Sequence, residues 1–222
     1  MAKVAKRAAL SFAGPPGCGK GTLFKFIVEP FCRKAGVRAI LIPTSDEIRL
    51  YRDEHPEESD GIMRDMKAGR LVEDGISNQA LINGASKVID GLRAEDFNGD
   101  CLFVLDGSPR TLGQINTSVF TMMSILNVAP PEYMTVFFTT PHYLCGHRIH
   151  GRGREDDLDE DAFITRWEQY FGKTEPAIKT LKNSAKDLGI EYREIDGQLS
   201  KKSVNLYQRI LFNKMWPEYF RG

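Results

Sequence analysis

The sequence predicts an α/β fold in which a parallel five-stranded sheet is covered by helices. Short apolar runs of strand length alternate along the 222 residues with longer stretches of helical periodicity. Polar motifs follow the carboxyl ends of several predicted strands, which is where sheets of this kind bind their ligands. Apolar and charged residues make up 41% and 27% of the chain, as in an ordinary globular protein.

The order of the elements supports one domain with two insertions. Apolar runs predict the strands, at residues 8–13, 39–43, 101–105, 134–139 and 191–195. Helical patterns lie between them, at residues 21–35, 78–92, 112–126, 159–188 and 201–213. Residues 44–75 are charged and helical in character without a strand, and residues 150–157 are polar and rich in glycine. We therefore expect a core of residues 1–43, 76–149 and 158–222, with insertions at 44–75 and 150–157.

Charge and cysteine content restrict the partners and the compartment. Thirty basic and thirty acidic residues give no net charge, so no overall field recruits nucleic acid. The four cysteines, Cys18, Cys32, Cys101 and Cys145, are too scattered for a zinc site and are expected to be reduced. No stretch is apolar for the length of a membrane span, and neither end carries a targeting signal. We expect a cytoplasmic monomer without membrane or nucleic-acid partners.

A glycine-rich stretch, Gly14–Thr22, reads GPPGCGKGT and directly follows the first predicted strand. Its glycines allow positive φ and close approach of an anion, and its amides gather at the start of the next helix, which predicts a phosphate loop. Lys20 can reach β- and γ-phosphates as a point charge. Because Gly21 separates Lys20 from Thr22, we do not expect that hydroxyl to bind a metal directly. An unusual glycine-rich turn is the alternative.

A second motif follows the third predicted strand. Asp106 ends the apolar run LFVLD, so its carboxylate is predicted to lie beside the phosphate loop and to hold the water shell of Mg²⁺. An aspartate after a strand is also common as a turn or helix cap. The motif continues through residue 114 as DGSPRTLGQ.

These motifs resemble those of the adenylate kinases. GKGT in the loop is similar to the form found in nucleoside monophosphate kinases, and DGSPRTLGQ resembles the AMP-binding signature Asp-Gly-Phe-Pro-Arg-Thr-x-x-Gln. The resemblance implies that Arg110 binds a phosphate and that Gln114 reads a base edge with its amide. Ser108 stands where the family has phenylalanine, which affects packing around the acceptor. Gln114 makes AMP a better match than a pyrimidine nucleotide.

Two motifs in residues 44–75 also resemble the family. PTSDEIR at 43–49 is similar to Ser-Thr-Gly-Asp-x-x-Arg, with Ser45 in place of glycine, and MKAGRLV at 66–72 is similar to Met-x-x-Gly-x-Leu-Val. By resemblance, Thr44 and Arg49 contact AMP, as do residues 70–72. Asp46 is predicted either to assist the water shell of the metal or to cap the following helix.

Residues 147–157 resemble the short lid of cytosolic-type adenylate kinases, which ends in Gly-Arg-x-Asp-Asp. The resemblance implies that Arg148, Arg154 and Arg166 face the transferred phosphoryl group. Leu144 stands where the family often has an arginine against adenine, so contact with the donor base is assigned to backbone near Leu199. His147 and His150 are predicted to lie on the lid surface, and the lid lacks a four-ligand zinc set.

The resemblance covers nearly the whole chain and implies a P-loop NTPase-like fold, with an insert that binds the nucleoside monophosphate and a short lid. It implies transfer of a phosphoryl group from MgATP to AMP, giving two ADP. The catalytic residues implied are Lys20, Arg110, Arg148, Arg154 and Arg166. Those implied for ATP are Gly17, Cys18, Gly19, Lys20, Gly21, Thr22, Arg148 and Leu199. Those implied for AMP are Thr44, Arg49, Arg70, Leu71, Val72, Gly107, Ser108, Pro109, Arg110, Gln114, Arg154 and Arg166.

Three alternatives remain open at this point. The acceptor could be UMP, CMP or a modified nucleotide, given Ser45, Ser108 and Leu144. The chain could be a nucleotide-binding sensor without turnover, although a pure binder gains little from groups that act on a transition state. A P-loop switch protein is the third, and no base-recognition or water-positioning motif of that class is evident.

Overall fold

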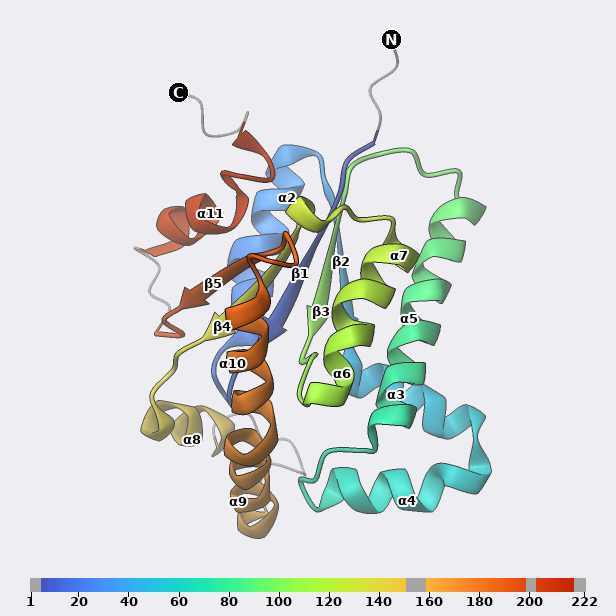
Figure 1. Ribbon diagram of the computed structural model, residues 1–222, viewed down its shortest axis with the longest axis vertical. Coiled ribbons are helices and arrows are strands. Elements are labelled where there is room, and N and C mark those ends of the chain that lie inside the picture. Colours follow the sequence, from blue (N-terminus) through green and yellow to red (C-terminus); the bar gives the residue numbers. More distant parts are fainter. Residues whose placement is uncertain (1–4, 151–158, 199–202, 218–222) are drawn as a thin grey trace.

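The computed structural model describes residues 5–150, 159–198 and 203–217 of the chain. Its sheet has five strands in the order β2-β3-β1-β4-β5, and every neighbouring pair is parallel (Figure 1). The strands are β1 (Arg7–Ala13), β2 (Arg38–Pro43), β3 (Cys101–Asp106), β4 (Tyr133–Phe138) and β5 (Glu191–Ile195). The predicted fold class is confirmed, and each strand lies within one residue of its predicted bounds.

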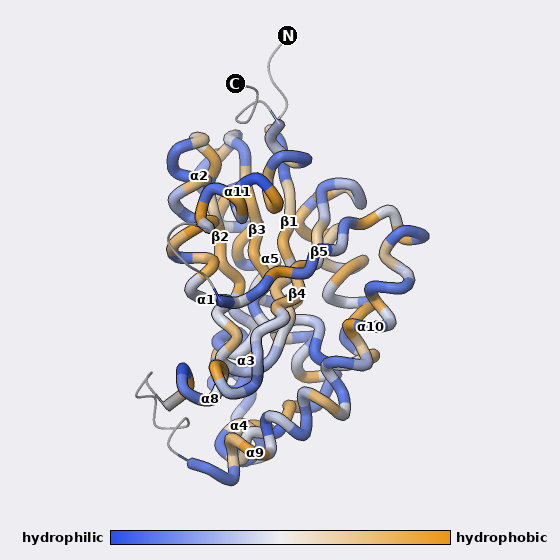
Figure 2. The backbone as a smooth tube through the Cα atoms, turned by 90° about the vertical axis from the view of Figure 1, so that its left-hand side faces the viewer, coloured by the Kyte–Doolittle hydropathy of each residue, from blue (hydrophilic) through white to orange (hydrophobic). Residues whose placement is uncertain are grey.

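The core has two halves, one on each face of the sheet, because side chains alternate along a strand. Leu10 and Phe12 of β1 face one half, which is covered by the helix after the phosphate loop and by α11 (Val204–Phe212). Ala9 faces the other half, under α5 (Asp74–Ala94), α7 (Met122–Leu126) and α10 (Glu175–Ser184). Figure 2 shows hydrophobic residues concentrated along the central strands and mixed with hydrophilic ones along the helices.

Two long predicted helices form as continuous helices that contain one wide turn each. The first runs through α1 (Lys20–Leu23), a π-helical turn η1 (Phe24–Val28) and α2 (Glu29–Ala35). The other runs through α9 (Glu160–Gln169), η5 (Tyr170–Thr174) and α10. Pro30 and Pro176 each lie two residues after a π turn. A proline cannot donate the helical hydrogen bond, so widening the preceding turn accommodates that missing donor.

The remaining helices match the prediction less evenly. Predicted helix 112–126 is α6 (Leu112–Asn116), η2 (Thr117–Thr121) and α7, and a short η3 (Pro130–Glu132) precedes β4. Helix α5 begins four residues before the predicted start at residue 78. Residues 44–75 are helical as predicted, with α3 (Thr44–Glu54) and α4 (Pro56–Lys67) built around a small core of Ile48, Tyr51, Ile62, Val72 and Ala80.

Helix α8 (His142–His150) was not predicted from the sequence. Its composition includes a glycine, a cysteine and histidines, which are weak helix formers. Cys145 and Ile149, one turn apart, are both fully buried. A Cβ atom placed on Gly17 would lie 2.5 Å from the carbonyl oxygen of Cys145, so α8 packs directly on the phosphate loop. Tertiary packing therefore stabilises a helix that local preference does not indicate.

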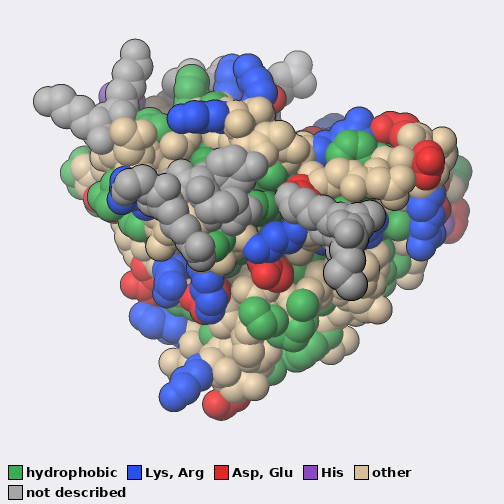
Figure 3. All heavy atoms as spheres, turned by 90° about the horizontal axis from the view of Figure 1, so that it is seen from above, with side chains coloured by type: hydrophobic (Ala, Val, Ile, Leu, Met, Phe, Trp, Pro, Cys, Tyr) green, Lys and Arg blue, Asp and Glu red, His purple; other side chains and the backbone are tan. Residues whose placement is uncertain are grey.

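Both α3–α4 and α8–α9 lie at the end of the sheet toward which β1 points, the lower end in Figure 1. The opposite end, seen in Figure 3, carries basic and acidic side chains interspersed with each other. The four cysteines are buried and form no disulfide, and burial raises the pKa of the Cys32 thiol to about 12. Within the described ranges, no helix combines the length and apolar character needed to cross a membrane.

Candidate active site

The phosphate loop connects β1 to the first helix, as its sequence predicts. Gly17 and Gly19 have φ angles of +78° and +105°, values that favour glycine. Gly17 also has no room for a side chain, because the carbonyl of Cys145 occupies that position. The loop therefore presents backbone amides at the start of the helix Lys20–Ala35, an arrangement that attracts anions.

Two of the predicted cations lie at this loop. The Nζ atom of Lys20 is 3.5 Å from the carbonyl oxygen of Gly14 and 3.5 Å from Sγ of Cys18. Arg148, on α8, donates from Nη1 to the carbonyl oxygen of Cys18 at 3.3 Å. The same oxygen accepts a bond of 2.9 Å from the hydroxyl of Thr140. The loop thus has a positive group from its own helix and another from α8.

Asp106 ends β3 in register with Phe12 of β1, so it lies next to the start of the phosphate loop. The amide of Gly107 donates to the carbonyl oxygen of Phe12 at 3.0 Å and fixes this position. Oδ1 of Asp106 is buried and accepts no hydrogen bond from any described residue. A buried carboxylate oxygen without a donor fits a water molecule of a hydrated Mg²⁺. In the described parts of the chain no group of three or more His, Cys, Asp or Glu could hold a metal.

Arg110 lies on the loop after β3, and its Nε donates to the carbonyl oxygen of Gly107 at 2.8 Å. Burial lowers the pKa of Arg110 below its usual value, the charge of Asp106 opposes that change, and the charge of Arg166 adds to it. Arg166 belongs to α9. Two guanidinium groups are therefore close enough to repel each other. They lie at the carboxyl end of the strands, where the phosphate loop also begins. An anion between them would relieve that repulsion.

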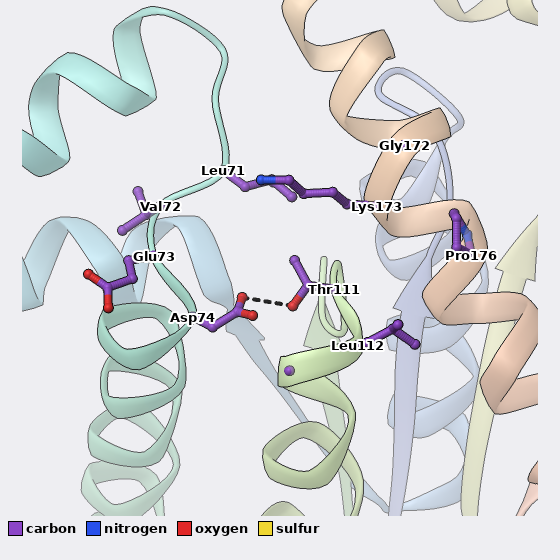
Figure 4. Close-up of a pocket in the computed structure, with 10 residues that line it drawn as sticks. Leu71, Val72, Glu73, Asp74, Thr111, Leu112, Gly172, Lys173 and Pro176 are labelled. Carbon is purple, nitrogen blue, oxygen red and sulfur yellow. Dashed lines mark hydrogen bonds between the residues drawn. The ribbon is translucent and has the colours of Figure 1, made fainter.

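Gln114 is held by a network that includes Asp74, the first residue of α5. Its Oε1 accepts from the backbone amide of Arg110 at 2.9 Å, and its Nε2 donates to Oδ1 of Asp74 at 2.9 Å. The hydroxyl of Thr111 donates to the same oxygen at 2.7 Å (Figure 4). Gln114 is 3% exposed, so its amide is held in place by packing as well as by hydrogen bonds.

Beside this network lies a cavity of about 430 Å³. It separates the end of the 44–75 segment from the helix that contains η5, and Lys173 extends across it toward Leu71 (Figure 4). Its other lining residues are Val72, Glu73, Asp74, Thr111, Leu112, Gly113, Gly172 and Pro176.

Ser108 takes part in a buried hydroxyl network under the loop. Its Oγ is hydrogen-bonded to Oγ of Ser118, and its carbonyl oxygen accepts from Oγ of Ser11 at 2.5 Å. The hydroxyl of Tyr133 donates to the carbonyl oxygen of Ser118 at 2.5 Å. All four residues are buried. The side chain of Ser108 therefore lies in the protein core.

Comparison with known proteins places this chain in a family. A protein named adenylate kinase from Prochlorococcus marinus strain NATL2A is 33% identical over 175 residues, which cover 78% of this chain and 84% of that relative. The chain belongs to the adenylate kinase family. An adenylate kinase from Prochlorococcus marinus strain MIT 9515 is 28% identical over 201 residues, 90% of this chain and 97% of the relative. No family model matches the chain.

Membership in the adenylate kinase family, together with the phosphate loop, supports a nucleoside monophosphate kinase. The structure brings together Lys20, Arg148 and Asp106 at the phosphate loop, and Arg110, Arg166 and Gln114 on the loop after β3 and the helices beside it. Arg154 and Leu199 lie outside the described residues, as does the predicted lid except for His150. Gly21 and Thr22 are exposed on the first turn of the helix.

In the 44–75 segment the predicted arginines are paired with neighbours. Arg49 forms an ion pair with Asp46 at 2.6 Å, and Arg70 forms one with Asp65 at 2.8 Å. Asp46 does not cap α3, because the helix already begins at Thr44; that alternative is wrong. The hydroxyl of Thr44 is buried, and no described residue hydrogen-bonds to it. A ligand that enters here would meet the hydroxyl of Thr44, which has no described partner. Arg49 and Arg70 could bind the ligand only by giving up their ion pairs with Asp46 and Asp65.

The segment also touches α9 directly. A Cβ atom on Gly69 would lie 2.2 Å from the carbonyl oxygen of Ala162 and 3.0 Å from Cγ of Arg166. Residues 44–75 and α9 therefore approach each other closely at a glycine.

Sequence reasoning missed Asp74 and Thr140. Asp74 follows the Leu71–Val72 pair and begins a helix, a position where an aspartate is common for purely local reasons. Thr140 follows β4 and carries no motif. The only available signal was position, since both residues lie at the ligand-binding end of the fold.

Proposed function

We propose that the chain transfers the γ-phosphoryl group of ATP to AMP and produces two ADP. The observation that carries this proposal is the pair Arg110 and Arg166, two like charges kept close beside the phosphate loop and Asp106. Such a pair suits a second phosphate group placed opposite the first. Family membership supports the same reaction, because the relatives are named adenylate kinase.

In this reaction a phosphate oxygen of AMP forms a bond to the γ-phosphorus, and the bond from that phosphorus to the β–γ bridging oxygen breaks. The attacking phosphate oxygen of AMP is already ionised at neutral pH, so no general base has to remove a proton, and both products are ADP. The protein aligns the two nucleotides and stabilises the charge on the transferred group. Lys20, Arg148 and the loop amides would hold the donor phosphates, and Arg110, Arg166 and Arg154 the acceptor phosphate.

Mg²⁺ fits the donor side of the site. It neutralises charge on the β- and γ-phosphates when it is bound with ATP. Asp106 would hold one of its water molecules through the buried oxygen that has no other donor. Since no described cluster of ligands could bind the ion by itself, the phosphates of ATP would supply the direct ligands.

We further propose that residues 44–75 form the acceptor-binding insert and residues 150–157 a short lid, both attached to a core of residues 1–43, 76–149 and 158–222. The insert is built around a small apolar cluster that it shares with Ala80 of α5, and it contacts α9 through Gly69. We propose that closure of the insert against α9 excludes water from the phosphates.

The proposal is tested by incubating the purified protein with MgATP and each of AMP, CMP, UMP, GMP and IMP, with ADP and the other products separated by chromatography. We expect AMP to be the best acceptor, with two ADP formed for each ATP consumed. A higher kcat/KM for UMP or CMP would show that the acceptor is wrong. Tight binding of ATP without product from any acceptor would show that the chain is a sensor.

A further inference from the structure

The orientation of the Gln114 amide is fixed by what its two partners can do. A backbone amide can only donate, so the atom facing Arg110 N at 2.9 Å must be the oxygen of Gln114. An ionised carboxylate can only accept, so the atom facing Asp74 Oδ1 at 2.9 Å must be the nitrogen. The amide cannot rotate by 180° without losing both hydrogen bonds. It keeps one N–H and one oxygen lone pair for a further partner.

Asp74 itself is held firmly. Its Oδ1 also accepts from the hydroxyl of Thr111 at 2.7 Å. Its Oδ2 lies over Gly113, where a Cβ atom would be only 2.4 Å away. The carboxylate therefore occupies space that a side chain at residue 113 would need, and it lines the cavity shown in Figure 4.

We infer that Asp74 is a specificity-determining residue: by fixing the orientation of Gln114, it selects acceptor bases that carry an amino group over those that carry a carbonyl. This inference rests on the proposed function, since it requires that Gln114 face the acceptor base. Asp74 acts through Gln114 and is a positioning residue.

The selection follows from the chemistry of the base edges. Adenine and cytosine each present an amino donor beside a ring nitrogen that accepts. Hypoxanthine, guanine and uracil present the reverse, a carbonyl oxygen beside a ring N–H. An amide that could rotate would serve both classes, whereas the fixed amide of Gln114 serves one. A base of the other class leaves polar groups unpaired in a buried site, which is costly.

The test compares two pairs of acceptors, AMP with IMP and CMP with UMP, in the wild-type protein and in variants of Asp74. In Asp74→Ala the amide of Gln114 loses one of its two anchors and keeps only the bond from the backbone amide of Arg110. We expect the kcat/KM ratio within each pair to fall at least about tenfold. In Asp74→Asn the side-chain oxygen still accepts from Gln114, so both ratios should stay within about threefold of wild type. Asp90→Ala, at an exposed aspartate near the other end of the same helix, is the matched control and should change neither ratio.

A double-variant cycle separates positioning from a general loss of structure. Gln114→Leu removes the amide and should lower both ratios by itself. In that background, Asp74→Ala should produce no further change in either ratio. If Asp74→Ala does not fold, Gln114→Leu and Asp74→Asn still decide the matter: unchanged ratios in Gln114→Leu, or ratios lost in Asp74→Asn, overturn the inference.

Other outcomes are equally distinct. If Asp74→Ala lowers kcat/KM for all four acceptors by the same factor, Asp74 is only structural and the inference is wrong. If the wild-type protein uses AMP but does not prefer it to IMP, the inference also fails, while the proposed function stands. If the protein uses CMP rather than AMP, the proposed function fails, and the ratio of CMP to UMP still tests the role of Asp74.

Discussion

The two halves of the site are built from different parts of the chain. At the phosphate loop the ligand-facing groups are backbone amides, with Lys20 and Arg148 contacting backbone oxygens of the loop. On the acceptor side, Gln114, Asp74 and Thr111 are linked to one another by side-chain hydrogen bonds. Backbone amides recognise phosphate, which every nucleotide carries, whereas a fixed side chain can distinguish one base from another.

The largest effect should come from the cation at the phosphate loop. Replacing Lys20 by methionine removes a charge that no backbone amide replaces, and turnover should fall at least about a hundredfold, the scale observed when one preorganised donor to a transition state is removed. Steady-state ADP formation measures this loss, and circular dichroism checks the fold. Lys25→Met, an exposed lysine one turn further along the helix, should retain wild-type turnover. Normal turnover in Lys20→Met would contradict its catalytic role.

Arg110→Ala should lower turnover by about a hundredfold as well, because we propose that Arg110 binds the acceptor phosphate. Burial lowers the pKa of Arg110 in the free protein, so removal of the side chain also removes the cost of burying that charge. We therefore expect no loss of thermal stability. Arg93→Ala, at an exposed arginine paired with Asp90 on α5, is the control for activity. A stable, fully active Arg110→Ala variant would remove the basis of the proposed function.

A smaller effect, on stability, is expected at the phosphate loop, the half of the site that is formed by backbone amides. Gly17→Ala places a methyl group against the carbonyl of Cys145 and imposes a positive φ on alanine, which costs roughly 1–2 kcal/mol before any displacement of α8. Urea unfolding measures the change. Gly21→Ala is the matched control, since its Cβ would meet open space within a helix and should stabilise the protein by roughly 0.5–1 kcal/mol. Equal stability of the two variants would mean that α8 does not rest on the loop.

The smallest effect on activity should come from the hydroxyl network beneath the loop that carries Arg110. Ser108→Ala leaves the Ser118 hydroxyl without that partner, which should cost about 1–3 kcal/mol of unfolding free energy. Because the network supports the loop that carries Arg110, the KM for the acceptor should rise while the KM for ATP stays constant. Ser124→Ala, at an exposed serine of α7, is the control. A rise in the KM for ATP instead would place the network on the other half of the site.

The sequence predicted what depends on local pattern and little of what depends on distant contacts. The strands, the positive φ of Gly17 and Gly19, and the position of Asp106 follow from periodicity and motif spacing. Helix α8 could not be predicted, since it is stabilised by burying Cys145 and Ile149 against the rest of the fold. The bond between Asp74 and Gln114 joins residues 40 positions apart, and no pattern in either segment indicates it.

The resemblance also suggested roles that geometry refines. It placed Ser108 beside the acceptor, whereas the structure turns its hydroxyl into the core. The sequence allowed two roles for Asp46, in the water shell of a metal or as a helix cap. The start of α3 at Thr44 excludes the helix cap. Motif similarity identifies which segment approaches a ligand, but the direction of each side chain depends on neighbours that the motif does not contain.

The contact between Gly69 and the carbonyl of Ala162 has a consequence for the catalytic cycle. Under the proposed function the acceptor enters and ADP leaves beside the two segments that meet there, and we expect this contact to separate once per turnover. A glycine against a carbonyl has no interlocking side chains to withdraw, which keeps the barrier to that separation low. A bulkier residue at position 69 would keep the two segments apart. We would then expect product to leave faster and water to be excluded less well.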